Sequence, residues 1–195
     1  MDNEIIVLTE ARPSRADAVK NRLLLLETAR RLFEDQGVDS VSMSAVAEAA
    51  GVGKGTLYRH FTNKTELCLG LLDSDQKTLQ ENTLARLRTL HDPYENMRWF
   101  LREVVLFVDS HAAWLHVGAL TIGVSTLEHE AHGWWRMTIR GLLQQLSFNG
   151  DLDYTADVLY MMVNVNAINF QRNALHYSLE RIIEGLWSTV ERLLY

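Results

Sequence analysis

The run from Ser42 to Leu67 constrains the fold of this 195-residue chain more than any other segment. Ala47 is small enough for two helices to cross there, Gly51 follows four residues later where a tight turn needs a positive φ, and Leu57 is an inward-facing plug six residues further on. Ser42 is a good N-cap, because its hydroxyl can accept a hydrogen bond from an orphan backbone amide. The spacing predicts two short helices joined by a glycine turn, which is the pattern of a helix-turn-helix.

The second helix of this motif is expected from Lys54 to Phe61. Leu57 and Phe61 share its inward face at an i, i+4 spacing, so the other side chains should face solvent. In a helix-turn-helix protein, the N-terminal part of this helix lies in the major groove of DNA. The residues that we expect to be exposed there are Lys54, Gly55, Thr56, Tyr58, Arg59 and His60.

The sequence AAGVGKGTLYRHFTNKTEL, residues 49–67, resembles the signature of the TetR family of bacterial repressors. With the preceding helix, the resemblance covers the first third of the chain. It implies that Lys54 and Thr56 lie at the start of the recognition helix, that Tyr58 and His60 contact phosphates, that Arg59 lies beside the groove and that Gly55 lets the backbone approach closely. Taken one at a time, these side chains also allow a simpler interpretation, in which Tyr58 packs across the turn and the basic residues form a solvated face.

Three further positions belong to the expected DNA contacts. Lys64 begins the fourth helix, where its ammonium and the helix dipole can act on one phosphate. Ser42 or Ser44 can add a hydroxyl contact. Gly53 departs from the family pattern, because many members have Ser or Thr there; glycine keeps the cap geometry but removes one expected phosphate contact.

The charge distribution separates the two parts of the chain. The net charge is −6. Residues 12–64 carry +3, whereas residues 65–195 carry −6. A basic head on an acidic body is the expected asymmetry if only the head contacts phosphate.

The hydrophobic periodicity predicts an all-α fold of about nine helices. The family resemblance implies that they form a three-helix DNA-binding head and a helical body for ligand binding and dimerisation. We expect a flexible arm over residues 1–16, the helix-turn-helix domain over 17–62 and the regulatory and dimerisation domain over 63–195. In the first helix, residues 17–36, Val19, Leu23, Leu26 and Phe33 fall on one face, and Gly37 ends it.

Capping signals and periodicity place the helices of the body. Asp92 and Pro93 start a helix to about residue 109, a shorter helix spans 112–118, and Ser125 with Glu128 forms a capping box before a helix to about residue 146. The last two helices are expected over residues 154–173 and 178–194.

All five tryptophans lie in the body, where most large aromatic side chains are core residues. The family resemblance implies an apolar cavity among the middle helices, and a largely apolar or aromatic ligand. The residues expected to line it are Phe100, Val104, Phe107, Trp114, Trp134, Met162, Asn166 and Phe170. Asn166, Asn169 and Asn173 share one helical face, which either meets water or the dimer partner, or binds the ligand through its amides.

The histidines do not match a catalytic metal site. His129 and His132 lie at i, i+3, whereas the zinc-protease pattern needs i, i+4 with Glu directly after the first His. Together with His111 and His116, they are expected at the surface or at an interface. We expect no enzyme activity, no metal and no cofactor. Cys68 is the one cysteine, and no signal peptide or membrane span is recognisable, so we expect a cytoplasmic protein.

The last two helices carry broad apolar stripes, which predict a dimeric four-helix bundle. The expected interface residues are Val158, Met161, Val165, Ile168, Leu179, Ile183, Leu186, Trp187 and Val190. Twofold symmetry would place two recognition helices on a palindromic operator, with half-sites ~34–36 Å apart. The leading hypothesis is a homodimeric repressor released from DNA by a small-molecule effector. A DNA-binding protein whose body only dimerises or binds a protein partner, and a transcriptional activator, are the alternatives.

Overall fold

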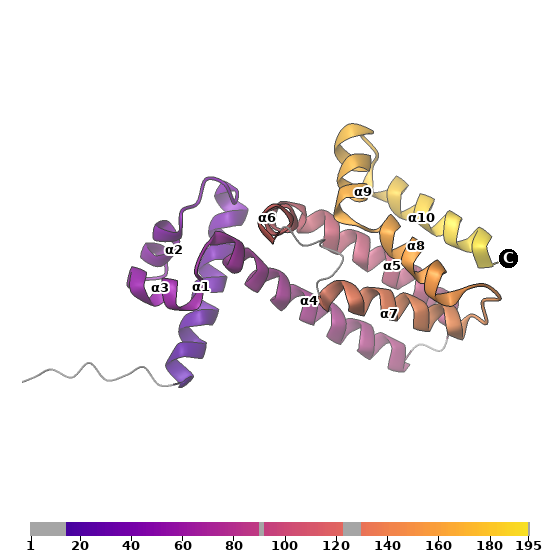
Figure 1. Ribbon diagram of the computed structural model, residues 1–195, viewed down its shortest axis with the longest axis horizontal. Coiled ribbons are helices and arrows are strands. Elements are labelled where there is room, and N and C mark those ends of the chain that lie inside the picture. Colours follow the sequence, from indigo (N-terminus) through magenta and orange to yellow (C-terminus); the bar gives the residue numbers. More distant parts are fainter. Residues whose placement is uncertain (1–14, 90–91, 123–129, 195) are drawn as a thin grey trace, which may run out of the picture. The chain divides into compact units, whose positions relative to one another are not determined.

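The computed structural model describes residues 15–89, 92–122 and 130–194, which form ten α-helices and one π-helix with no strand among them. The helices are α1 (Arg15–Gln36), α2 (Met43–Ala49), α3 (Lys54–His60), α4 (Lys64–Thr89), α5 (Pro93–Ser110), α6 (Ala112–Ile122), α7 (Glu130–Gln145), α8 (Leu152–Met162), α9 (Val165–Asn169), the π-helix η2 (Phe170–Ala174) and α10 (Leu179–Leu194) (Figure 1). The chain divides into two compact units, a head that ends at Lys64 and a body that begins at Thr65. The predicted all-helical fold is confirmed.

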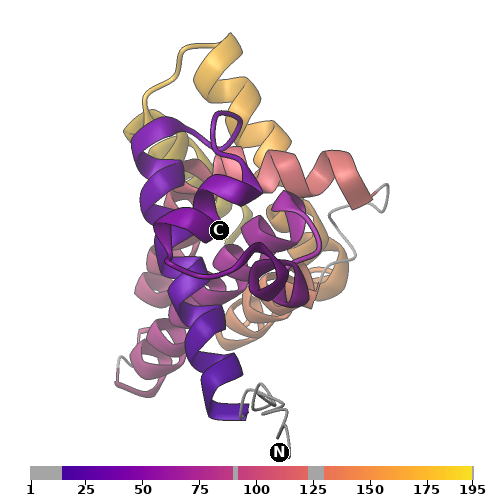
Figure 2. The same cartoon turned by 90° about the vertical axis from the view of Figure 1, so that its left-hand side faces the viewer.

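The head is a three-helix unit in which α2 packs against α1 and α3 packs against α2 (Figure 2). Its core contains Leu25, Ala29, Phe33, Val38, Val41, Val46, Ala47, Leu57 and Phe61. The helix ends follow the expected signals. Gly37 has φ 80° and its amide donates to the carbonyl of Phe33, whereas the Ser42 hydroxyl accepts a hydrogen bond from the amide of Ala45 at 3.1 Å.

The first helix differs from its prediction in two respects. It begins at Arg15 rather than after residue 16, and residues 1–14 of the expected arm lie outside the described residues. Val19 and Leu23 were expected on the inner face, but they are 60% and 59% exposed. The buried face instead includes Leu25 and Ala29, and all buried positions of this helix lie between Leu25 and Phe33. The prediction of an inward-facing Val19 and Leu23 is therefore wrong.

The body has one hydrophobic core that takes residues from α4, α5 and α7 to α10. Helix α5 contributes the fully buried Met97, Phe100, Val104 and Val105 and contacts α7, α9 and α10. Asp92 caps this helix by accepting a hydrogen bond from the amide of Tyr94, and Pro93 is its first residue, as predicted. The predicted capping box of Ser125 and Glu128 lies outside the described residues. Over the described part of the chain, no helix is both long and apolar enough to cross a membrane.

The helix expected over residues 154–173 is broken into three pieces, so that prediction is wrong. Helix α8 ends at Met162, and Asn164 is an N-cap whose side-chain oxygen accepts a hydrogen bond from the amide of Asn166 at 2.9 Å. This local bond competes with continuation of the helix. Helix α9 then widens into the π-helix, in which the amide of Leu175 donates to the carbonyl of Phe170.

Candidate nucleic-acid interface and effector region

The turn between α2 and α3 has the geometry that its sequence requires. Gly51 has φ 67°, a value that side-chain-bearing residues rarely adopt. The amide of Gly51 donates to the carbonyl of Glu48, and the amide of Val52 donates to the carbonyl of Ala47 at 3.0 Å. These bonds fix where α3 begins relative to α2.

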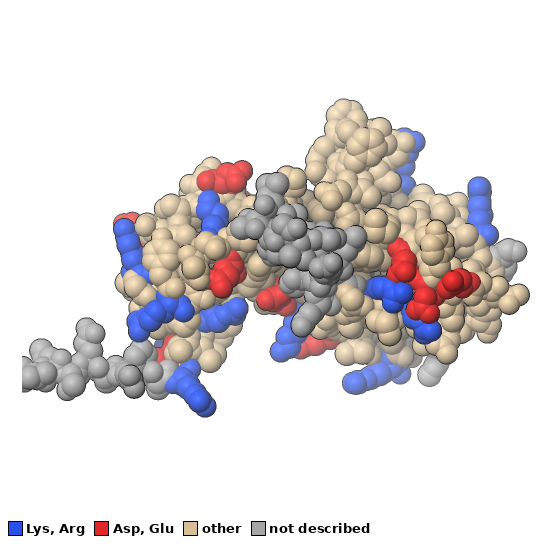
Figure 3. Space-filling model, in the orientation of Figure 1, with Lys and Arg blue, Asp and Glu red and all other residues tan. Residues whose placement is uncertain are grey.

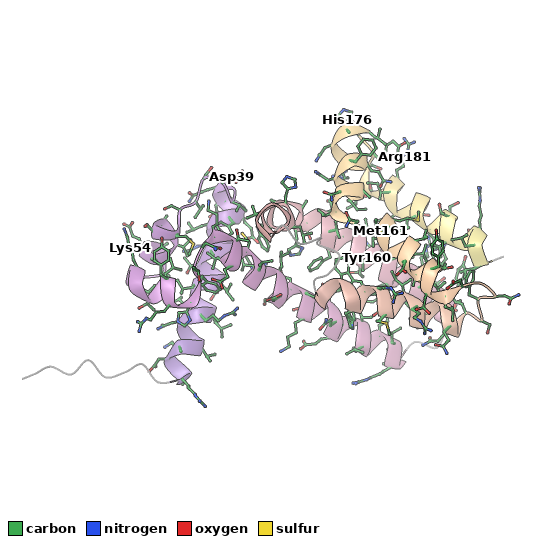
Figure 4. The ribbon with its side chains drawn as sticks, in the orientation of Figure 1. Asp39, Lys54, Tyr160, Met161, His176 and Arg181 are labelled. Carbon is green, nitrogen blue, oxygen red and sulfur yellow. The ribbon has the colours of Figure 1, made fainter. Side chains whose placement is uncertain are left out.

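Helix α3 hides one side chain and exposes most of the others. Leu57 has no exposed surface, whereas Tyr58 is 50% exposed. Lys54 and Arg59 are exposed, and Lys54 lies on the outer side of the head (Figure 4). Such a helix can place a cation, a phenol and a guanidinium against an external surface without disturbing its own core.

The small residues around α3 leave its N-terminal end open. Gly53 is the N-cap and makes no side-chain cap hydrogen bond, in agreement with the missing hydroxyl. A Cβ atom added to Gly55 would meet no atom within 4 Å, so the backbone there is accessible. Thr56 is half-buried, and its hydroxyl accepts a hydrogen bond from Nη2 of Arg59 at 3.2 Å. His60 is half-buried beside the ring of Phe61.

Two of the expected phosphate contacts already have hydrogen-bond roles inside the head. The ammonium of Lys64 donates to the carbonyls of Val38 and Asp39, at 2.7 and 3.3 Å. An ammonium has three donors, so one remains for a phosphate. The Ser42 oxygen accepts the α2 cap bond, which leaves its hydroxyl hydrogen available, and Ser44 is half-buried. Figure 3 shows basic and acidic side chains interspersed over the visible face of the head.

The residues expected to line one ligand cavity lie in three different environments. Phe100 and Val104 are fully buried, and Phe100 meets Trp134 edge-on at 5.7 Å between ring centroids. Asn166 is exposed and Phe170 is 58% exposed, because the break after α8 turns this segment outward. Met162 lines a different, open groove on the body. In the described residues these side chains are therefore spread over the core, an exposed segment and an open groove, and their role in ligand binding stays a prediction.

Two of these residues, Phe107 and Trp114, belong to an aromatic cluster that also contains His111 and Trp135. Phe107 stacks on His111 with 4.3 Å between centroids and meets Trp135 edge-on at 5.5 Å. His111 meets Trp114 edge-on at 5.1 Å. The cluster therefore joins α5, α6 and α7.

Helix α4 is tied to the aromatic cluster by two adjacent polar residues that sequence reasoning missed. Nε2 of His111 lies 2.7 Å from a carboxylate oxygen of Asp75, and Nε1 of Trp135 donates to Oε1 of Gln76 at 3.0 Å. His111 was expected at the surface or an interface, but its side chain is only 13% exposed. Asp75 and Gln76 lie within a run of polar residues, 73–78, and nothing in this local pattern marks two of them as turned toward the core.

A groove of ~790 Å³ runs between α8 and α10 and is bordered by α9 and η2. Val158 and Met161, which were expected at a dimer interface, line it and are 38% and 50% exposed. Figure 4 shows Met161 on α8 and Arg181 at the start of α10. Sequence reasoning missed Tyr154, Gly185 and Thr189 on the same surface.

Most of the other expected interface residues face the interior of the subunit. Val190 has no exposed surface, and the core also contains Val165, Ile168, Leu186 and Trp187, each at most 6% exposed. The apolar stripes of α9 and α10 pack against α5 within the subunit, which accounts for their breadth without a partner. Of these five residues, only Leu186 also lines the groove. Leu179 and Ile183 line a second, smaller groove against α5. The Asn173 amide donates to the Asn169 side chain, while Asn166 lies exposed on the same segment.

An exposed basic helix that follows a glycine turn on a three-helix head defines a helix-turn-helix DNA-binding protein. Residues 25–71 match the family model described as bacterial regulatory proteins, tetR family. Residues 25–71 are therefore similar to the DNA-binding domain of this family, and the chain is a DNA-binding transcriptional regulator.

The similarity to known proteins extends beyond the head. An HTH-type transcriptional regulator of Staphylococcus aureus is 27% identical over 168 residues, which are 85% of this chain and 90% of the relative. A TetR-family regulator from Pectobacterium atrosepticum shares the fold with a TM-score of 0.74, at 20% identity over 93% of this chain and 96% of that protein.

Two solved structures with ligands have the same fold. The repressor FadR of Thermus thermophilus, in complex with lauroyl-CoA, has a TM-score of 0.68 at 19% identity and covers 89% of this chain and 92% of its own. AibR, in complex with isovaleryl coenzyme A and operator DNA, has a TM-score of 0.57 at 23% identity and covers 87% and 97%.

Proposed function

We propose that this protein is a homodimeric repressor that binds a palindromic operator and leaves it when a small, largely apolar or aromatic effector occupies the body. The observation that carries the proposal is helix α3, which buries Leu57 completely while it exposes Lys54, Tyr58 and Arg59. Residues 17–62 would form the DNA-binding domain, and residues 63–195 the regulatory and dimerisation domain.

The proposed DNA contacts come from three places on the head. The exposed side chains of α3 would reach base edges and phosphates, and Gly53 and Gly55 would allow close approach of the backbone. Ser42 and Ser44 would contribute hydroxyl donors from α2. Lys64 would contribute less than an unengaged lysine, because two of its three donors bind carbonyls.

The proposed dimer uses the groove between α8 and α10. Its exposed apolar side chains, including Val158 and Met161, would be buried by the same surface of a second copy. Gly185 lets another backbone approach α10, because a Cβ atom added there meets nothing within 4 Å. Two recognition helices related by a twofold axis would then read half-sites ~34–36 Å apart.

The proposed effector site adjoins the aromatic cluster. In the structures of FadR and AibR, the same fold holds lauroyl-CoA and isovaleryl coenzyme A. An effector releases DNA only if it prefers the conformation that cannot bind the operator, since equal affinity for both conformations shifts nothing. Helix α4 is the proposed lever, because it begins at Lys64 in the head and contacts the cluster through Asp75 and Gln76.

Footprinting of the purified protein on the DNA upstream of its own gene tests this function. We expect a protected palindrome at moderate salt, and a Lys54→Ala variant should lose the protection. A compound panel that displaces the protein from this DNA would support effector release. No protected palindrome would overturn the proposal. DNA binding without release by any compound would favour a body that only dimerises, and transcription that rises on binding would favour an activator.

A further inference from the structure

The side-chain amide of Gln76 has a fixed orientation. The indole Nε1 of Trp135 can only donate, and it lies 3.0 Å from Oε1 of Gln76. A flipped amide would place two donors against each other, so the NH₂ group must point away from Trp135. The Trp135 contact therefore decides which end of the amide is left over.

The donor that is left over is buried and unpaired. Gln76 is 6% exposed, and among the described residues its Nε2 atom has no hydrogen-bond partner. A buried donor without an acceptor destabilises the fold, and such groups are rare in native proteins. The bond to Trp135 explains only the Oε1 acceptor of Gln76. It does not explain why a residue that also carries an NH₂ donor is buried at this position.

The surroundings of Gln76 determine what could satisfy the donor. Trp135 is 2% exposed and lies against Phe107, so the environment is aromatic and apolar. The carboxylate of the adjacent Asp75 is engaged by His111 at 2.7 Å. An organic cation would therefore find the Asp75 carboxylate already bonded to His111, whereas a neutral acceptor would find an available N–H group on Gln76.

We propose that Nε2 of Gln76 donates a hydrogen bond to a carbonyl oxygen of the effector, so that the effector is an apolar carbonyl compound such as a ketone or an acyl thioester. This inference rests on the proposed effector-regulated function. The contact acts on α4 itself, and binding replaces an unpaired buried donor by a hydrogen-bonded one. Discrimination is strong in this situation, because a hydrocarbon of the same shape leaves the donor unpaired.

Two pairs of probes that differ only at the carbonyl test the proposal. Acetophenone is compared with ethylbenzene, and lauroyl-CoA with S-dodecyl-CoA, by calorimetry and thermal shift on the full-length protein. We expect the carbonyl member of at least one pair to bind about tenfold more tightly than its partner. Equal binding within both pairs, or binding of neither carbonyl compound, would overturn the proposal.

Matched variants separate the donor from the structural role of Gln76. The Trp135→Phe variant removes the indole but keeps the amide donor. The double variant Gln76→Met with Trp135→Phe removes the donor as well and leaves no orphaned indole. We expect the carbonyl preference to persist in the first variant and to disappear in the second, with both proteins folded by circular dichroism. A preference that persists in the double variant would contradict the proposed contact.

The DNA assay distinguishes this inference from the proposed function. If compounds without an acceptor release the operator equally from the wild type and from the double variant, the effector-regulated function stands and the role of Gln76 is wrong. If the protein binds no palindrome at all, the proposed function fails, whereas the probe preference measured without DNA still reports on Gln76.

Discussion

Lys54 is the residue at which charge, exposure and position on α3 coincide. Replacing it by Ala should weaken operator binding by ~1–3 kcal/mol and lower the salt dependence by about one released counterion if it contacts a phosphate. Fluorescence anisotropy over a range of salt concentrations measures both quantities. Lys77→Ala, an exposed position on α4 in the body, is the matched control. Equal affinities of the two variants would argue against a recognition role for Lys54.

Gly51 and Gly55 should respond to the same substitution with opposite signs. Gly51→Ala forces a side chain into φ 67° and should destabilise the protein by ~1–2 kcal/mol. Gly55→Ala lies in helical backbone with open space around it and should stabilise the head by up to ~1 kcal/mol while it reduces DNA affinity. Urea denaturation and anisotropy measure these changes. A destabilised Gly55→Ala variant would contradict the open space around Gly55.

Single residues also show where sequence reasoning succeeds. Ala47, Gly51 and Leu57 lie within eleven residues of the chain, so their spacing alone predicts the turn and the buried plug. Val19 and Leu23 fit the same periodicity as Leu26, yet they are exposed, because burial also depends on which part of α1 is covered, and its buried positions begin at Leu25. Gln76 and His111 were missed, since their partners Trp135 and Asp75 are 59 and 36 residues away in sequence.

At the scale of elements, α7 and α8 are joined by ion pairs at the surface (Figure 3). Arg140 donates to Asp153 at 2.9 Å, and Arg136 pairs with Asp157 and Asp153. The hydrogen bond from Arg140, with a further contribution from Arg136, lowers the pKa of the Asp153 carboxyl. A carboxyl with a lowered folded pKa stabilises the protein above its unfolded pKa of ~3.9, and this contribution is lost as the pH falls through the folded pKa.

Asp153→Asn should therefore lower the urea midpoint slightly at pH 7 and have a smaller effect below about pH 3. The effect is expected to be small because Asp153 is at the surface and screened by solvent. In 1 M NaCl the difference at pH 7 should also shrink, since the Debye length falls to ~3 Å. A midpoint difference that grows on acidification would have the wrong sign for this pair.

The break after α8 shows why helix continuity is hard to predict. Apolar residues continue at helical spacing through the break, at Met161, Val165 and Ile168. The Asn164 cap is a local bond whose strength competes with a helix that the same residues could form. The packing of α9 against α5 and α8 selects the broken form, and such packing is not visible in a single sequence.

For the whole molecule, the two units differ in what can be predicted. The head depends on residues near one another in the chain, so its recognition helix follows from motif spacing. The body combines α4, α5 and α7 to α10 into one core, and the same apolar stripes could have served a partner. Val190 and Trp187 were assigned to the dimer for this reason, whereas Val158 and Met161 remain exposed and available.

Substitution of Met161 tests the proposed dimer, because the chain also has an exposed methionine outside the groove that can be substituted as a control. Met161 lines the groove and is 50% exposed, whereas Met137 on α7 is 57% exposed and does not line it. Met161→Lys should place like charges across a twofold interface and shift the protein to monomers in sedimentation velocity, whereas Met137→Lys should leave a dimer.

Because one head alone contacts one half-site, the Met161→Lys protein should also lose most of its affinity for a full palindrome but bind a half-site like the wild-type head. Dimers formed equally by both variants would exclude this groove as the interface, while an unchanged circular dichroism spectrum would show that the loss of dimers does not come from unfolding.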